Sequence, residues 1–197
     1  VSFDGFKALN ALTLWPGLRS IAAVELSPAV LALADRFADD GPVATGKPAP
    51  FRGDPRVRLH ATDGRHFLAT APERSLDLVT MEPLLPYAPG TSLLYSSEFY
   101  RSVRRALRPG GLCVQWVPTH AMPQEMFRAL LATFAAEFPG TSVWLFDRST
   151  LLVGGAEPLP DLVADAVRIG GRLAGCGPAL RTSLHECSLG GAEDLAL

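Results

Sequence analysis

Short apolar segments alternate with amphipathic segments along most of this 197-residue chain. The apolar segments have the length of buried strands, and the segments between them place apolar residues at helical spacing. Strands and helices that alternate in this way form βαβ units, in which the strands run parallel and the crossovers are right-handed. The pattern therefore predicts an α/β fold with a doubly wound, mostly parallel sheet.

The expected strands lie at residues 20–25, 56–62, 76–82, 112–118, 141–146 and 149–155. The expected helices lie at about residues 6–14, 28–38, 64–68, 98–107 and 123–138. The RPGG segment at residues 108–111 is expected to stop the helix before it. Only the segment DRS separates the last two strands, so they are expected to form a hairpin, which makes the final strand antiparallel.

The chain is expected to hold one large domain and a smaller extension. Residues 1–156 carry the strand and helix pattern, whereas residues 157–197 contain helical stretches without a strong strand. The chain begins without a methionine, directly in a helix-like pattern, and both ends look cut. We therefore expect a domain truncated at its N-terminus, followed by a C-terminal helical segment.

The composition disfavours several classes of partner. A net charge of -2 provides no broad basic field for nucleic acid. The three cysteines have no C-x-x-C spacing and the histidines no ligand spacing, so neither a disulfide framework nor a metal site is expected. No apolar run approaches the roughly 20 residues that span a bilayer, and no signal peptide is present, which predicts a cytoplasmic location.

Three of the expected strands end in a carboxylate, at Glu25, Asp63 and Glu82. The carboxyl ends of parallel strands meet at one edge of the sheet, where doubly wound folds bind ligands. A carboxylate can accept hydrogen bonds from both hydroxyls of a ribose, and Asp63 beside Gly64 could accept one from an adenine amino group. The placement predicts a nucleoside site; the alternative is that each acid only caps a loop or a helix.

The loop after Glu82 contains Tyr87, which is a candidate wall for a substrate because binding residues favour loops. Tyr100, by contrast, continues the following helix and is expected to pack in the core. The arginines of that helix are expected to form a solvated face.

Four segments together resemble the polyamine aminopropyltransferases, the spermidine synthase family: VELSPAVL, DPRVRLHATDGRHFL, LDLVTMEP and SLLYSSEFYRSVRRALRPGGLCVQW. The resemblance covers roughly residues 1–150. It implies the Rossmann-like fold of the S-adenosylmethionine-dependent methyltransferases. It also implies decarboxylated S-adenosylmethionine as the co-substrate, with no metal.

The resemblance also implies roles for single residues. Glu25 falls on the residue that holds the ribose, Asp63 and Gly64 on the adenine side, and Glu82 on the catalytic aspartate. Gln115 falls on a glutamine near the active site, where it is expected to bind substrate.

Two departures from the family pattern affect the expected site. Leu85 stands where the family has a second acid that helps to hold the amine. The glycine-rich loop that cradles the cofactor is expected immediately before Val1, so Ser2 is at best part of its tail and a candidate cofactor-binding residue.

The leading functional prediction is transfer of an aminopropyl group from decarboxylated S-adenosylmethionine to a small-molecule amine. A methyltransferase that uses S-adenosylmethionine itself on a small molecule is the second reading. A non-catalytic nucleoside-binding domain of a membrane protein is the third, for which Leu85 is the chief argument. A homodimer and an attached membrane region are left open.

Overall fold

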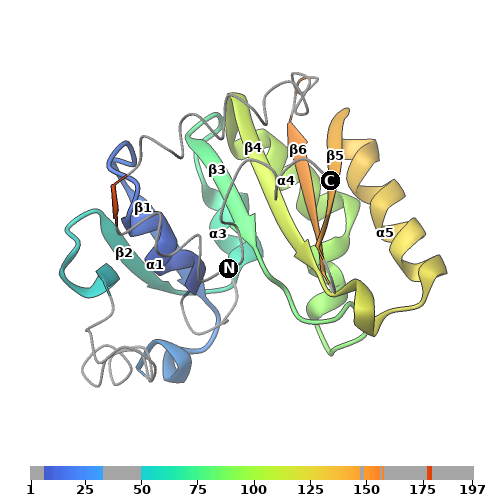
Figure 1. The fold of residues 1–197 in the computed structure, drawn as a ribbon, viewed down its shortest axis with the longest axis horizontal. Helices are drawn as coiled ribbons and strands as arrows, with labels where there is room; N and C mark the ends of the chain where they lie inside the picture. The colour runs from blue at the N-terminus through green and yellow to red at the C-terminus, as the bar shows by residue number, and fades with distance from the viewer. Residues whose placement is uncertain (1–6, 33–49, 147–148, 156, 158–176, 179–197) are drawn as a thin grey trace. The chain divides into compact units, whose positions relative to one another are not determined.

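The computed structural model describes residues 7–32, 50–146, 149–155, 157 and 177–178 (Figure 1). These residues belong to two compact units. The first unit contains the described residues of 24–31 and 60–157, and the second contains residues 7–23, 32, 50–59 and 177–178. Nearly all of the predicted segment 157–197 lies outside the described residues, and so does the end of the predicted helix 28–38.

The first unit contains a four-stranded sheet with the order β3–β4–β6–β5. These strands are β3 (Leu76–Met81), β4 (Leu107–Val117), β5 (Gly140–Phe146) and β6 (Ser149–Gly155). β3 and β4 run parallel, whereas β6 runs antiparallel to both β4 and β5. The predicted terminal hairpin and the antiparallel final strand are therefore confirmed.

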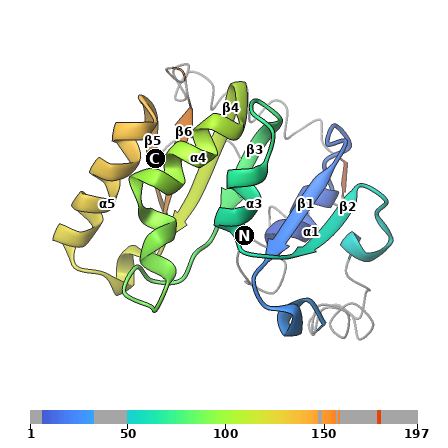
Figure 2. The same ribbon diagram turned by 180° about the vertical axis from the view of Figure 1, so that it is seen from behind.

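Three helices lie on one face of this sheet, as Figure 2 shows. They are α3 (Gly64–Thr70), α4 (Ser97–Ala106) and α5 (Gln124–Glu137), and α4 packs against both of the others. α4 begins where the Ser96 hydroxyl accepts a hydrogen bond from the Phe99 N–H at 3.2 Å. Its buried residues recur at helical spacing and face the sheet; they are Phe99, Tyr100, Val103 and Ala106.

The core under these helices is aromatic. The ring of Phe134 meets that of Tyr100 edge-on at 5.1 Å between centroids and that of Phe138 at 4.8 Å. Gly154 of β6 makes room for this cluster, because a Cβ atom at its position would lie 2.7 Å from atoms of both phenylalanines. Alternate residues of β4, among them Cys113 and Val117, complete the core from the sheet side.

A separate two-stranded sheet joins β1 (Ile21–Glu25) to β2 (Val57–Ala61). The Ile21 N–H donates to the Arg56 carbonyl at 2.8 Å, and the Thr62 N–H donates to the Glu25 carbonyl at 3.0 Å. The two strands therefore advance in the same direction, as the βαβ pattern predicts. Their carboxyl ends carry Glu25 and Asp63.

In the second unit, Arg56 ties α1 (Lys7–Thr13) to the chain that enters β2. Its guanidinium donates to the carbonyl oxygens of Thr13, Trp15 and Leu18 at 2.6, 2.8 and 3.1 Å. These bonds satisfy carbonyl groups at and beyond the C-terminal end of α1. Hydrogen bonds from Arg56 also lower the pKa of Asp54 to about 2.

The RPGG segment corrects one detail of the predicted fold. α4 does end at Ala106, but residues 108–111 lie inside β4 and not in a turn before it. Leu76 pairs with Leu107 and Leu78 with Leu112, so the intervening residues form an irregular bulge in which Gly110 adopts φ 74°. The glycine supplies the left-handed backbone that this bulge requires.

None of the helices within the described ranges is both long and apolar enough to cross a membrane.

The close contact between Gly154 and the aromatic cluster predicts that adding one methyl group at this position destabilises the fold. Gly154→Ala should lower the free energy of unfolding by about 1–3 kcal/mol or more, because the new methyl group overlaps Phe134 and Phe138. Gly17→Ala is the control, since no atom lies within 4 Å of the Cβ it would add. Urea unfolding of both variants measures the difference; equal stabilities would contradict the packing described.

Candidate active site

Glu25 ends β1 with its carboxylate at the carboxyl edge of the two-stranded sheet. Its Oε1 accepts a hydrogen bond from the Ser27 N–H at 2.8 Å, which orients the side chain across the start of the helical residues 28–32. The second oxygen, Oε2, has no hydrogen-bond partner within the described part of the chain. One oxygen therefore holds the local turn while the other can accept bonds from a ligand.

Asp63 is the N-cap of α3, where it accepts a hydrogen bond from the Arg65 N–H at 2.8 Å. The Arg65 guanidinium also binds both carboxylate oxygens, with the closest contact at 2.5 Å. These side-chain bonds to Arg65 are the main cause of a lowered pKa for Asp63. The capping role that the sequence offered as an alternative is thus present, and it fixes the carboxylate beside the buried Gly64.

Glu82 follows the last residue of β3 and is half-buried. The residues on either side of it are fixed, since Met81 pairs with Gln115 of β4 and the ring of Pro83 is fully buried. The loop beyond makes bonds of its own: Ala88 N–H donates to the Leu85 carbonyl at 2.9 Å, and Thr91 N–H to the Ala88 carbonyl at 3.0 Å. Glu82 therefore lies at the start of an ordered loop, directly after the strand.

Tyr87 lies in this loop with 60% of its surface exposed. Its hydroxyl donates to the Ala121 carbonyl at 3.1 Å, and Ala121 belongs to the turn that follows β4. Because β3 and β4 run parallel, both segments leave the sheet at the same edge. This bond holds the exposed ring of Tyr87 at the sheet edge that carries Glu82.

Gln115 lies on the helix-covered face of β4 and has no exposed surface. Neither atom of its amide has a hydrogen-bond partner of good geometry within the described residues. Burial is the larger influence on the hydroxyls of Tyr95 and Tyr100, and the Gln115 amide acts against it by lowering the pKa of both. Burial raises the pKa of Tyr95 to about 12 and that of Tyr100 further.

The described contacts join the predicted site residues in two pairs. Glu25 and the Asp63 turn are linked through the backbone bond at Thr62, and Glu82 and Gln115 through the pairing of β3 with β4. Ser2 lies outside the described residues. Among the residues that are described, no group of three or more His, Cys, Asp or Glu side chains could hold a metal ion.

The sequence reasoning missed Tyr95, whose hydroxyl lies 3.0 Å from the Leu84 carbonyl and 3.3 Å from the Pro83 carbonyl. A tyrosine at the end of an apolar stretch gives no sign in the sequence that its hydroxyl reaches back to a loop eleven residues earlier.

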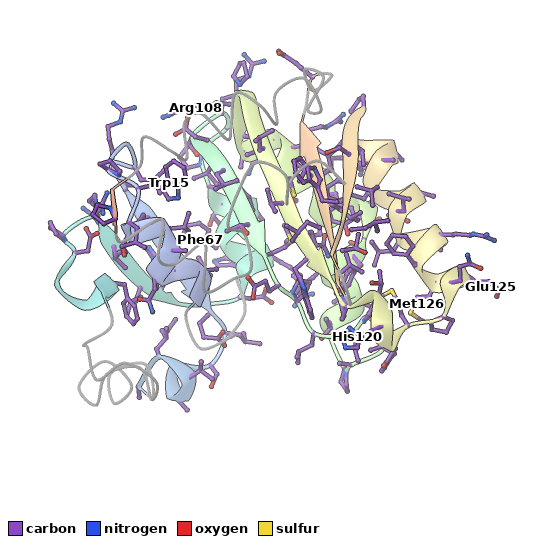
Figure 3. The ribbon with its side chains drawn as sticks, in the orientation of Figure 1. Trp15, Phe67, Arg108, His120, Glu125 and Met126 are labelled. Atoms are coloured by element: carbon purple, nitrogen blue, oxygen red, sulfur yellow. The ribbon has the colours of Figure 1, made fainter. Side chains whose placement is uncertain are left out.

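A basic hollow lies at the other end of the sheet. Arg108 and His120, both labelled in Figure 3, stand near the start and just beyond the end of β4. The hollow has a volume of about 740 Å³, and its lining includes Arg101, Arg105 and Arg108. These arginines bind Glu137, carbonyl groups at the end of α3, and Asp77. The hollow therefore forms part of a paired surface network at the edge opposite Glu82.

The Spermine/spermidine synthase domain model matches residues 4–147 of the chain. The polyamine aminopropyltransferase of Nitrosomonas europaea is 31% identical over 138 residues, which cover 68% of this chain and 39% of that protein. The chain thus spans well under half the length of this curated relative.

Two solved structures show the same fold. The spermidine synthase of Thermotoga maritima gives a TM-score of 0.63 at 15% identity, covering 79% of this chain and 52% of that one. Human methyltransferase-like protein 13, solved in complex with SAH, gives 0.57 at 18% identity and covers 93% of both chains. The predicted α/β fold of the methyltransferase kind is confirmed.

The hydrogen bonds between Arg65 and Asp63 predict a measurable change in the pKa of Asp63 when Arg65 is replaced. Arg65→Ala should raise the pKa of the Asp63 carboxyl toward 3.8, because it removes the bonds that favour the ionised form. In the unchanged protein the folded pKa lies below the unfolded one, so the stabilisation from Asp63 is fully present above the unfolded value. It is lost as the pH falls through the folded pKa. Carboxyl NMR titration tests the shift; Arg128→Ala, on the exposed side of α5, is the control and should leave the Asp63 titration unchanged.

Proposed function

The chain belongs to the spermine/spermidine synthase family, and from this premise we propose that it is the catalytic part of an aminopropyltransferase. The donor would be decarboxylated S-adenosylmethionine and the acceptor a small-molecule amine. The observation that carries the proposal is Glu82, a carboxylate in an ordered loop at the carboxyl end of β3. That edge is where doubly wound sheets place their chemistry.

The reaction forms one bond and breaks one. The amine nitrogen attacks the propyl carbon next to the sulfonium, the carbon–sulfur bond breaks, and sulfur keeps the electron pair as the thioether of methylthioadenosine. The nitrogen must lose a proton, because alkyl amines have a pKa near 10 and are mostly protonated at neutral pH. A nearby carboxylate can attract the cation, orient it and accept a hydrogen bond as the proton leaves.

Glu25 and the Asp63–Gly64 turn would hold the nucleoside. Within the described part of the chain, one oxygen of Glu25 accepts no bond, and this oxygen would accept from the ribose hydroxyls, which are donors. Asp63 is aligned by its bonds to Arg65 and to the N-terminal end of α3, and each carboxylate oxygen has a further lone pair for a donor such as an amino group. Ser2 stays a predicted contact to the donor.

The part of the proposed site that would bind the acceptor amine is mainly apolar. In the loop after Glu82, the Leu84 side chain is 69% exposed, Leu85 is half-buried, and Tyr87 presents its ring. Glu82 is the only acid between the end of β3 and the start of η2 (Thr91–Tyr95). We therefore propose an acceptor that offers one cationic amine to Glu82 and places an apolar portion against Leu84 and Tyr87.

Donor exchange provides the decisive experiment. The full-length protein is incubated with labelled decarboxylated S-adenosylmethionine or labelled S-adenosylmethionine and a panel of monoamines and diamines. Label found in an amine product from the decarboxylated donor supports aminopropyl transfer. Label transferred only from S-adenosylmethionine favours a methyltransferase, and binding without transfer favours a non-catalytic nucleoside-binding domain.

Glu82→Gln should lower turnover by about 10²-fold or more, the usual contribution of a positioned proton acceptor. Nucleoside affinity should stay nearly unchanged, because Glu25 and Asp63 carry that contact. Steady-state kinetics and calorimetry with methylthioadenosine measure the two effects. Glu125→Gln at the exposed start of α5 is the matched control. Unchanged turnover together with a loss of stability would mean that Glu82 only caps its loop.

Leu85→Asp should improve the use of diamines relative to monoamines, because it adds a second carboxylate to the acceptor loop. We expect the ratio of kcat/KM for putrescine to that for a monoamine to rise about tenfold, which corresponds to one added charge-assisted contact of about 1.4 kcal/mol. Leu93→Asp, at an exposed leucine of the following turn, controls for added charge. A ratio that rises equally in both variants would remove the specific role of residue 85.

A further inference from the structure

The buried Tyr95 hydroxyl reaches the backbone of the loop that carries Glu82. Tyr95, at the end of η2, is 7% exposed, and its hydroxyl lies 3.0 Å from the Leu84 carbonyl and 3.3 Å from the Pro83 carbonyl. These carbonyl groups belong to the two residues that directly follow Glu82. Since the Leu84 side chain is largely exposed, its own burial cannot fix this part of the backbone.

A second buried polar group lies on β4, beside the strand that leads into Glu82. Gln115 pairs with Met81, the residue before Glu82, and its amide is fully buried without a hydrogen-bond partner of good geometry in the described chain. A buried amide in that state is costly.

The titration of Tyr95 agrees with a hydroxyl that donates to the loop carbonyl groups. Burial raises the pKa of its hydroxyl to about 12, so the group stays protonated and can donate throughout the neutral range. The Gln115 amide acts in the opposite sense and lowers that pKa, as a donor to the phenol oxygen does.

We propose that Tyr95 is a positioning residue for Glu82: the bond from its hydroxyl to the Leu84 carbonyl fixes the backbone after Glu82 and so holds its carboxylate toward the acceptor. The proposal rests on the proposed aminopropyl transfer for its catalytic meaning. The tether, by which we mean the bond from the Tyr95 hydroxyl to the loop backbone, can be tested without any reaction.

The chain offers a closely matched pair of variants. Tyr95→Phe removes only the hydroxyl that reaches the loop. Tyr100→Phe removes the second buried hydroxyl beside Gln115, which makes no hydrogen bond within the described residues and lies on α4. Both changes delete one oxygen from the same core, so a difference between them reports the bond to the loop.

Amide hydrogen exchange is the first measurement. In Tyr95→Phe, exchange at the Ala88 and Thr91 amides, which close the loop, should rise about fivefold or more, while α4 and β4 keep their protection. In Tyr100→Phe these loop amides should exchange as in the unchanged protein. Equal exchange at the loop in both variants overturns the tether.

Kinetics is the second measurement, in the full-length protein with the donor and amine that it uses best. Tyr95→Phe should lower kcat about tenfold with the affinity for methylthioadenosine unchanged, because a displaced carboxylate affects chemistry more than nucleoside binding. Tyr100→Phe should keep the kcat of the unchanged protein. Faster loop exchange with unaltered kcat would show that Tyr95 orders the loop without positioning Glu82, and would overturn the catalytic part.

The exchange and kinetic measurements separate this inference from the proposed function on which it rests. If no donor and amine give turnover in the unchanged protein, aminopropyl transfer fails as a function. The exchange difference between the two variants then still supports or overturns the tether.

Discussion

The parallel pairing of β3 with β4 is the constraint on which the candidate site depends. It makes both strands leave the sheet at one edge, so that the loop with Glu82 and the turn with Ala121 can be joined by the Tyr87 hydroxyl. The same register places Gln115 beside Met81. The pairing is stable because alternate residues of both strands are buried under α4 and α5, where the aromatic core excludes water.

At the strand-end acids, a local structural role would leave room for the proposed ligand role. Asp63 caps α3 and binds Arg65, and Glu25 accepts the Ser27 N–H, so both carboxylates already perform the function of a cap. A carboxylate has more lone pairs than these bonds use. Capping therefore fixes the side chain in advance, which lowers the entropy that binding a nucleoside would otherwise cost.

The sequence predicted the parts of this structure that periodicity controls. The strand at 76–82 and the helix near 98–107 were placed to within a residue or two, because β-spacing and helical spacing differ clearly there. The hairpin of β5 and β6 followed from the short connection between them. The bulge at residues 108–111 was misjudged, because Pro and Gly interrupt a strand and end a helix with the same residue types.

The site was less accessible to sequence reasoning than the fold. Strand-end placement selected Glu25, Asp63 and Glu82 as candidates, since that rule depends only on topology, and their ligand roles stay a prediction. It could not show that Arg65 would bind Asp63, nor that the amide of Gln115 would be buried on the helix-covered face. Tyr95 was missed for the same reason, because its role depends on a contact between segments that only the folded chain brings together.

The bond from Tyr95 ends on the main chain of the loop. A hydroxyl that binds the carbonyl oxygen of residue 84 places no demand on which side chain residue 84 carries, and the leucine there is largely exposed. Replacements at residues 84 to 87 can therefore change the surface offered to an acceptor while the backbone keeps its path. Sequence changes on the outside of this loop therefore leave intact the backbone that carries Glu82.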